Sequence, residues 1–266
     1  MQKPQNWNPS GFSFPQAGHV TIARVYGHVG QEQVGTGVIR HALCTVLRIR
    51  ADVGGPPETE VDEHLEIGPF SITLRRPADA EGLIDEERFD DDEFLPYWAE
   101  LWPSGLALAR HVATHALAGR TVLELGCGLG LPSLAAALAG ADVLATDWAP
   151  EALGLLRRNA ASSELTITTA ILAWGGDDAL ELGQFDLVLA ADVLYEARNA
   201  RPLLRLLDRV VAPGGEALIA DPGRRHAAAF FDGARAEGWF VEVSAVAELP
   251  AGGITRLRRR LPRETG

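Results

Sequence analysis

The 266-residue chain is poor in lysine and cysteine, with one lysine, Lys3, and two cysteines, Cys44 and Cys127. Two cysteines, one of them inside a glycine-rich segment, give no disulfide framework and no cysteine metal site, and they favour a reducing compartment. No apolar run approaches the roughly 18 residues that cross a bilayer, and the N-terminus lacks the basic and apolar regions of a secretion signal. We therefore expect a cytoplasmic protein without a membrane partner.

Positive charge is also scarce. The chain has 24 Lys and Arg residues against 36 Asp and Glu residues, which gives a formal net charge of −12 and a pI near 5.0. Affinity for nucleic acid comes largely from neutralising phosphates, so no nucleic-acid partner is expected, and basic proteins or small molecules are better candidates. The hydrophobic content of 47% is ample for the core of one large domain with a small accessory region.

The most informative stretch of the sequence is a strand, a glycine loop and a helix in succession. The apolar run Thr121–Leu125 predicts a buried parallel strand. Three glycines at alternate positions, Gly126, Gly128 and Gly130, then predict a tight turn that residues with a Cβ do not allow. Pro132 fits the first turn of a following helix. Such a loop lets a ligand lie directly against the backbone.

Two details of this stretch argue against a dinucleotide as the ligand. The spacing is G-x-G-x-G rather than G-x-G-x-x-G. Glu124, two residues before the first glycine, would repel a phosphate by roughly 1 kcal/mol or more. Asp147 follows the glycines by about 20 residues and ends the next expected strand, where an acid accepts hydrogen bonds from ribose hydroxyls. A ribose, a positive charge and no phosphate fit S-adenosyl-L-methionine. The alternative is glycines that serve only packing and helix capping.

Composition divides the chain into three parts. Residues 1–60 have no clear hydrophobic period, and we expect a flexible extension or a misassigned start, with a transit peptide less favoured. Residues 61–103 form an accessory part with a hairpin and an acidic segment at 79–93, which is either a solvated surface or a field that attracts a basic substrate. Residues 104–266 form the ligand-binding domain. The N-terminal histidines lack metal-ligand spacing, and no metal is expected: His19, His28 and His41.

Strands and helices alternate along the rest of the chain. This alternation predicts an α/β fold: a Rossmann-like, seven-stranded, mainly parallel sheet with helices on both faces, preceded by a β-hairpin at 65–74. Ser104 is expected to cap a helix that runs to about Leu117. The other expected helices are 151–159, 202–211 and 225–237. The other expected strands are 141–146, 165–172, 185–190, 216–220, 240–246 and 254–260.

Candidate site residues gather where these strands end. Ligands of open α/β sheets bind at the carboxyl ends of the strands. The residues that end or follow a strand include Glu124, the three glycines, Asp147, Trp174, Ala190, Asp192 and Asp221. Tyr97, Trp98 and Trp102 precede a helix and serve either core packing or the wall of the ligand site.

Several motifs resemble those of known methyltransferases. The pattern Glu124-x-Gly126-x-Gly128-x-Gly130 with Asp147 resembles the class I (seven-strand) S-adenosylmethionine-dependent methyltransferases. The run Asp192-Val-Leu-Tyr195 resembles the D-x-x-Y of the family 16 protein-lysine methyltransferases, and it lacks the Asp/Asn-Pro-Pro-Tyr/Phe of enzymes that methylate nucleobase amines. Three further segments resemble the branch that acts on the β subunit of electron transfer flavoprotein: Tyr97-Trp-Ala, Trp102-Pro-x-Gly and Asp221-Pro-Gly-Arg.

The resemblance implies an enzyme that transfers a methyl group to nitrogen, with a protein lysine as the acceptor. It places the three glycines against the methionine part of the cofactor, Asp147 on the ribose and Trp174 against the adenine, with Asp192 and Tyr195 at the target amine. Trp102, Glu124 and Ala190 are expected to complete the cofactor site. The expected partner is electron transfer flavoprotein β subunit or a ribosomal protein. A small-molecule N- or O-methyltransferase and a nicotinamide-binding domain remain alternatives.

A lysine acceptor raises a question of protonation, because its pKa is about 10.4. A mostly apolar channel lowers that pKa by disfavouring the charged form. Asp192 attracts the ammonium but also holds its proton, so we expect it to orient the amine through a hydrogen bond. Tyr195 is expected to line the channel. The alternatives are a helix N-cap for Asp192 and simple packing for Tyr195.

Overall fold

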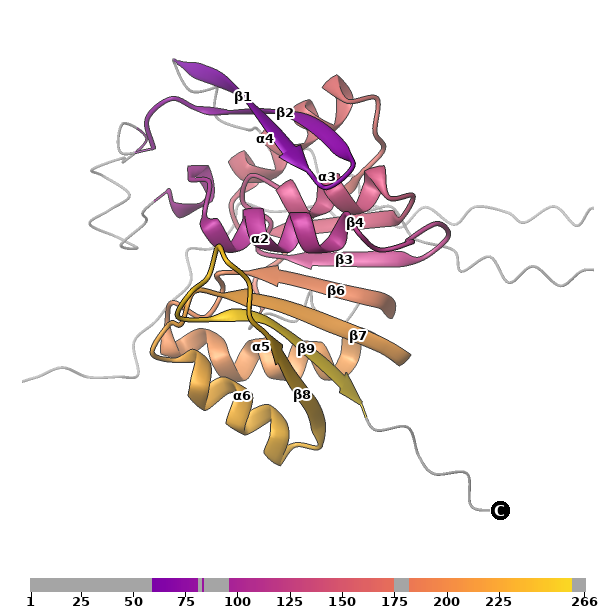
Figure 1. The fold of residues 1–266 in the computed structure, drawn as a ribbon, viewed down its shortest axis with the longest axis vertical. Helices are drawn as coiled ribbons and strands as arrows, with labels where there is room; N and C mark the ends of the chain where they lie inside the picture. The colour runs from indigo at the N-terminus through magenta and orange to yellow at the C-terminus, as the bar shows by residue number, and fades with distance from the viewer. Residues whose placement is uncertain (1–58, 81–82, 84–95, 175–181, 260–266) are drawn as a thin grey trace, which may run out of the picture. The chain divides into compact units, whose positions relative to one another are not determined.

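The computed structural model describes residues 59–80, 83, 96–174 and 182–259 (Figure 1). All of them belong to a compact unit that begins at Leu47. The expected extension at 1–60 and the acidic segment at 79–93 lie almost entirely outside the described residues. Within the described ranges, no helix is long and apolar enough to cross a membrane.

A seven-stranded sheet forms the centre of the described unit. Its strand order is β5-β4-β3-β6-β7-β9-β8. The first five of these strands are parallel to one another, and β9 runs antiparallel to both of its neighbours. The expected Rossmann-like, mainly parallel α/β sheet is therefore confirmed. The strands are β3 (Thr121–Leu125), β4 (Asp142–Asp147), β5 (Thr168–Ile171), β6 (Phe185–Ala191), β7 (Val211–Asp221), β8 (Trp239–Ser244) and β9 (Gly253–Arg259).

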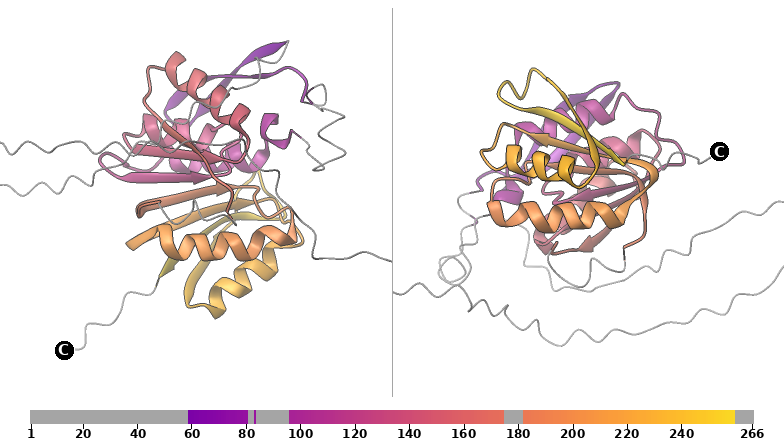
Figure 2. Two further views of the ribbon diagram at one scale, coloured as in Figure 1. Left: turned by 180° about the vertical axis from the view of Figure 1, so that it is seen from behind. Right: turned by 90° about the horizontal axis from the view of Figure 1, so that it is seen from below.

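Helices cover both faces of the sheet, so its central strands are apolar on both sides. On one face lie α2 (Pro103–Val112), α3 (Leu131–Leu138) and α4 (Pro150–Ser162). On the other lie α5 (Ala197–Val210) and α6 (Ala227–Ala236), as the view from behind shows (Figure 2). The side chains of β3 alternate accordingly. Its successive residues pack into the two different hydrophobic clusters: Val122 on the α2 side and Leu123 on the α5 side.

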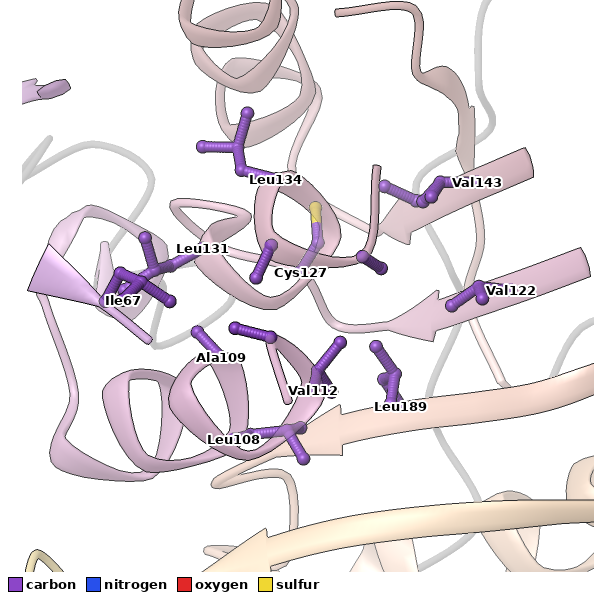
Figure 3. Packing of buried hydrophobic residues seen from close by; sticks show 14 of the residues in the cluster. Ile67, Leu108, Ala109, Val112, Val122, Cys127, Leu131, Leu134, Val143 and Leu189 are labelled. Carbon is purple, nitrogen blue, oxygen red and sulfur yellow. The ribbon is translucent and has the colours of Figure 1, made fainter. Parts of the chain in front are cut away.

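A hairpin of β1 (Glu60–Ile67) and β2 (Phe70–Pro77) packs onto the α2, α3 and α4 side of this domain. Ile67 shares the larger hydrophobic cluster with residues of α2 and α3 (Figure 3). Buried Asn159 of α4 accepts a hydrogen bond from the Arg75 N–H of β2 and donates one to its carbonyl, each 2.9 Å long. The expected hairpin is therefore present, longer than predicted, and fastened to the domain by both apolar and polar contacts.

Several expected element boundaries are wrong. Helix α2 begins at Pro103 and has Trp102 at its N-cap, because proline is favoured at the first helical position. Ser104 is instead buried inside the helix, and its hydroxyl has no hydrogen-bond partner among the described residues. Helix α5 begins five residues before Pro202, which lies inside it. Strand β7 begins at Val211 rather than at residue 216, with a register shift against β6.

The close approach of the glycine loop to α4 gives a stability test. A Cβ on Gly130 would lie 2.4 Å from Leu156 Cδ1, and the φ of Gly130 is +74°. Gly119 has the same kind of backbone, with φ of +75°, but open space around the missing Cβ. We expect Gly119→Ala to cost about 1 kcal/mol of unfolding free energy through backbone strain alone. Gly130→Ala should cost about 1–3 kcal/mol more because of overpacking.

Urea denaturation of the two variants and the parent measures both costs. Equal costs for the two substitutions would contradict the packing of the loop against Leu156.

Candidate active site

The glycine loop after β3 exposes its backbone to a pocket at the carboxyl end of the sheet. Gly126, Gly128 and Gly130 all have positive φ, at +69°, +50° and +74°, which side chains rarely adopt. A Cβ on Gly126 would lie 3.3 Å from a ring carbon of Trp174, and one on Gly128 would lie 3.2 Å from the Trp98 carbonyl oxygen. Glycine is therefore needed at these positions both for the turn and for the space beside it.

Glu124 lies beneath this loop and closes the N-terminus of α3. Its carboxyl group is buried, and its Oε2 accepts hydrogen bonds from the Ser133 backbone N–H, at 3.0 Å, and from the Ser133 hydroxyl. Burial raises the pKa of Glu124 to about 8. The N–H groups at a helix start are where a pyrophosphate would bind, and here a carboxyl group of the protein itself already uses one of them.

Asp147 ends β4, lines the same pocket and lies directly against the loop. Its Oδ2 accepts a hydrogen bond from the Gly128 N–H and its Oδ1 one from the Ala149 N–H, both at 2.9 Å. Burial raises the pKa of this carboxyl group. Each carboxylate oxygen has a second lone pair, so ribose hydroxyls can still donate to Asp147.

An aromatic segment forms another wall of the pocket. The 3-10 turn η2 (Tyr97–Ala99) and the following Trp102 line it, and Trp102 Nε1 donates to the Tyr97 carbonyl at 2.8 Å. The Tyr97 ring meets the Tyr195 ring edge-on, with 5.7 Å between centroids. Trp98 lines the pocket and also packs on the core cluster, so this residue takes part in both core packing and the pocket wall.

Asp192 and Arg224 form a two-point ion pair at the same end of the sheet. Arg224 Nε donates to Asp192 Oδ1 at 2.7 Å and Nη2 donates to Oδ2 at 3.0 Å. Asp192 has a φ of +56°. It does not cap α5, whose N-cap is Glu196. The interpretation of Asp192 as a helix N-cap is therefore wrong. Its partner, Arg224, lies 32 positions further along the chain, and nothing in the sequence indicated this contact.

Most of the expected site residues meet in this one pocket, but Ala190 and Asp221 do not line it. Ala190 is buried in the cluster on the α5 side, and its neighbour Ala191 lines the pocket instead. Trp148, 53% exposed, also borders the pocket and was not foreseen, although it directly follows Asp147. The predicted residues among those that line the pocket are Trp102, Glu124, Gly126, Gly128, Gly130, Asp147, Trp174, Asp192 and Tyr195.

The pocket residues fit a positively charged nucleoside. Carboxyl groups stand at both strand ends, Glu124 and Asp147, and the anion position of α3 is already used. The glycine backbone and Trp174 line the same pocket, and the Trp174 ring lies close beside Gly126. This fold and this pocket define the class of Rossmann-like S-adenosylmethionine-dependent methyltransferases.

Within this class, the chain belongs to the lysine methyltransferase family, whose model matches residues 92–235, more than half of the 266 residues. The electron transfer flavoprotein beta subunit lysine methyltransferase of Danio rerio is 37% identical over 135 residues, which are 48% of this chain and 51% of the relative. The histone-arginine methyltransferase METTL23 of Xenopus laevis is 35% identical over 115 residues, 41% of this chain and 49% of the relative.

The chain spans about half the length of the curated relatives that it matches. Among solved structures, the T. Thermophilus 16S rRNA N2 G1207 methyltransferase has a TM-score of 0.55 at 17% identity, with 77% of this chain and 52% of that chain covered. That likeness confirms the fold.

The raised pKa of Glu124 predicts that ligand binding is coupled to proton release. At pH 7 a group with a pKa of about 8 is mainly protonated. A cationic ligand beside it favours the carboxylate and therefore displaces the proton. We expect binding of S-adenosyl-L-methionine to release about half a proton or more at pH 7 and to tighten between pH 6 and pH 8.

Calorimetry in buffers of different ionisation enthalpy measures this release, and Glu124→Gln should abolish the part that belongs to Glu124. The same buffer dependence in the parent and the variant would contradict the coupling.

Proposed function

We propose that the protein transfers a methyl group from S-adenosyl-L-methionine to the side-chain nitrogen of a lysine in a protein substrate. The observation that carries the proposal is that one pocket is lined both by the glycine loop with Asp147 and by Asp192 with Tyr195. When bound, S-adenosyl-L-methionine supplies a methyl group on a positively charged sulfur, and the attacking amine must be neutral. Transfer of this kind depends mainly on positioning, which the residues of the pocket provide.

Each part of the pocket has a proposed task. The backbone at Gly126, Gly128 and Gly130 holds the methionine part of the cofactor, Asp147 the ribose and Trp174 the adenine. Glu124 favours the positive charge of the ligand, and Trp102 closes the pocket from the aromatic side. At the acceptor end, Asp192 orients the amine and Tyr195 lines the approach. The role of Ala190 is confined to its backbone, because its side chain is in the core.

The Asp192 and Arg224 pair favours lysine over arginine as the acceptor. A guanidinium group binds a carboxylate best through two parallel hydrogen bonds. Both oxygens of Asp192 already accept such bonds from Arg224, at 2.7 and 3.0 Å. An amine needs only one acceptor lone pair, which each oxygen still has. One relative is named a histone-arginine methyltransferase, so an assay must distinguish methylation of lysine from methylation of arginine.

A protein substrate is favoured by the exposed rim of the pocket. Tyr97 is 45% exposed, Trp148 53% and Tyr195 39%, so large side chains at the rim are open to a macromolecular surface. The net charge of −12 suits a basic segment around the target lysine. Electron transfer flavoprotein β subunit is the first acceptor to test, since several relatives are named for it. A ribosomal protein is a second candidate. We expect cytoplasmic action without nucleic acid.

The experiment that tests this function combines labelled cofactor with three acceptors: purified electron transfer flavoprotein, a lysate of the protein's own cells, and the small-molecule fraction of that lysate. We expect label in a protein band and, by mass spectrometry, on a lysine side chain. Label only in the small-molecule fraction would instead establish the alternative, a small-molecule N- or O-methyltransferase. Label on an arginine would contradict the choice of lysine.

Removal of the Asp192 carboxylate should stop transfer without stopping cofactor binding. We expect Asp192→Ala to lower kcat by about 100-fold or more, because the amine loses its orientation, while calorimetric affinity for S-adenosyl-L-methionine changes less than about threefold. Asp142→Ala is the matched control. Asp142 is exposed and begins β4, whose other end carries the pocket residue Asp147, so its removal should change neither kcat nor the affinity for the cofactor. Weak cofactor binding with a normal kcat at saturation would refute the acceptor role.

A further inference from the structure

The carboxylate of Asp192 lies where the target amine is expected, and a carboxylate without a partner at this position would hinder methyl transfer. The Asp192 side chain is only 6% exposed. A poorly hydrated negative charge beside an ammonium group raises the pKa of that ammonium, by about 1–3 units for a close pair. A lone Asp192 would therefore attract the lysine and at the same time keep it protonated and unreactive.

In the structure, Asp192 is not a lone charge. Arg224 holds both of its oxygens in a two-point pair, and the guanidinium lies 5.8 Å from the centroid of the Trp102 ring. The Asp192 backbone is itself fixed, because its N–H donates to the Ala220 carbonyl at 2.9 Å. Asp192 lines the pocket just after the end of β6, and Arg224 binds it from the turn that follows β7.

The turn that carries Arg224 is rigid as well. The backbone N–H groups of Gly223 and Arg224 both donate to Asp221 Oδ1 at 2.8 Å. Gly223 has a φ of +95°, and a Cβ there would lie 2.5 Å from the Ala251 carbonyl oxygen. Asp221 is buried at the end of β7. A side chain on such a turn is well placed to act as a fixed charge rather than as a mobile surface residue.

We propose that Arg224 is a positioning residue of the acceptor site, which holds and neutralises Asp192 so that this carboxylate accepts a hydrogen bond from the target amine without retaining the amine's proton. The inference rests on the proposed lysine methylation. It assigns a role to the Asp-Pro-Gly-Arg segment at 221–224, and it explains how one carboxylate both orients an amine and leaves it neutral.

Other titratable groups near the pair come from several elements of the fold. The buried Asp221 accepts a hydrogen bond from the Arg224 backbone N–H, and burial raises the pKa of Asp221. Burial also raises the pKa of Tyr195, so its hydroxyl stays neutral at pH 7. Among the described residues, the other titratable groups that line the pocket or face these residues are Tyr97, Glu100, Glu124, Cys127, Asp147, Glu196 and Arg198. Arg224 is the cation that binds Asp192 among the described residues.

The test is the pH dependence of kcat at saturating cofactor, because kcat reports ionisations in the enzyme–substrate complex. The acceptor is purified electron transfer flavoprotein, or the protein that the lysate experiment labels. In Arg224→Met, we expect the rise of kcat with pH to move upward by about 1–2 units, with an activity about 10- to 100-fold lower at pH 7.5 that recovers toward pH 10. Arg224→Lys keeps the charge but loses the two-point geometry, and it should shift the profile less.

Arg225→Met is the matched control. Arg225 is exposed, adjacent in sequence and equal in charge, and its Nε donates to His226 rather than to Asp192. We expect it to leave the profile unchanged. Calorimetric affinity for S-adenosyl-L-methionine in all three variants checks that the cofactor site is still folded.

A readout independent of activity is the NMR signal of the Arg224 Nε proton. We expect this proton to be protected from exchange by its bond to Asp192 Oδ1, and to stay protected when S-adenosylhomocysteine and a lysine-containing acceptor are added. Loss of protection on addition of the acceptor would mean that the amine displaces Arg224, which overturns the proposal.

Two kinetic results would also overturn it. A loss of kcat in Arg224→Met that is equal at every pH assigns Arg224 a merely structural role. A lower KM and a higher kcat/KM in Arg224→Met than in the parent protein would show that Arg224 competes with the substrate for Asp192. If the parent protein methylates no lysine in any acceptor, the proposed function itself is wrong and this inference fails with it, a result distinct from the other two.

Discussion

The site depends on one buried contact, the carboxyl group of Glu124 at the N-terminus of α3. Strand β3 delivers Glu124 to this place, and the three glycines after it turn the chain so tightly that α3 starts directly above the carboxyl group. The helix end is thereby made unsuitable for a phosphate and suitable for a cation. The position of this one acid, together with the G-x-G-x-G spacing of the loop, distinguishes the pocket from that of a dinucleotide-binding protein.

Two carboxyl groups at the ends of neighbouring strands then serve opposite purposes. Glu124 accepts its hydrogen bonds from Ser133, and burial raises its pKa to about 8, so a cationic ligand can displace its proton. Asp192, at the end of β6, is bound by a guanidinium group on both oxygens and can act as an acceptor of hydrogen bonds without adding an uncompensated charge. The parallel sheet brings both to one edge, and their partners determine the difference in their chemistry.

Much of this architecture could be predicted from the sequence. Apolar strands, Gly126 to Gly130 and the acid at Asp147 depend on local rules of periodicity and backbone conformation, and these elements were found. The start of α2 at Pro103 was predicted wrongly because Ser104 was expected to be the cap, although proline is favoured at the first helical position. The start of α5 at Ala197 and the beginning of β7 at Val211 were missed as well. Ala190 was chosen where Ala191 lines the pocket, since a slip of one residue in a strand exchanges its two faces. The partner of Asp192, 32 residues away, left no signal in the spacing.

The claim that a cationic nucleoside rather than a dinucleotide occupies the pocket is tested most directly by thermal unfolding of the full chain. Only a ligand that binds the folded state raises the midpoint. We expect S-adenosyl-L-methionine and S-adenosylhomocysteine, each at 1 mM, to raise it by several degrees, and NAD at the same concentration to leave it unchanged. An increase with NAD equal to that with S-adenosyl-L-methionine would contradict the role assigned to Glu124.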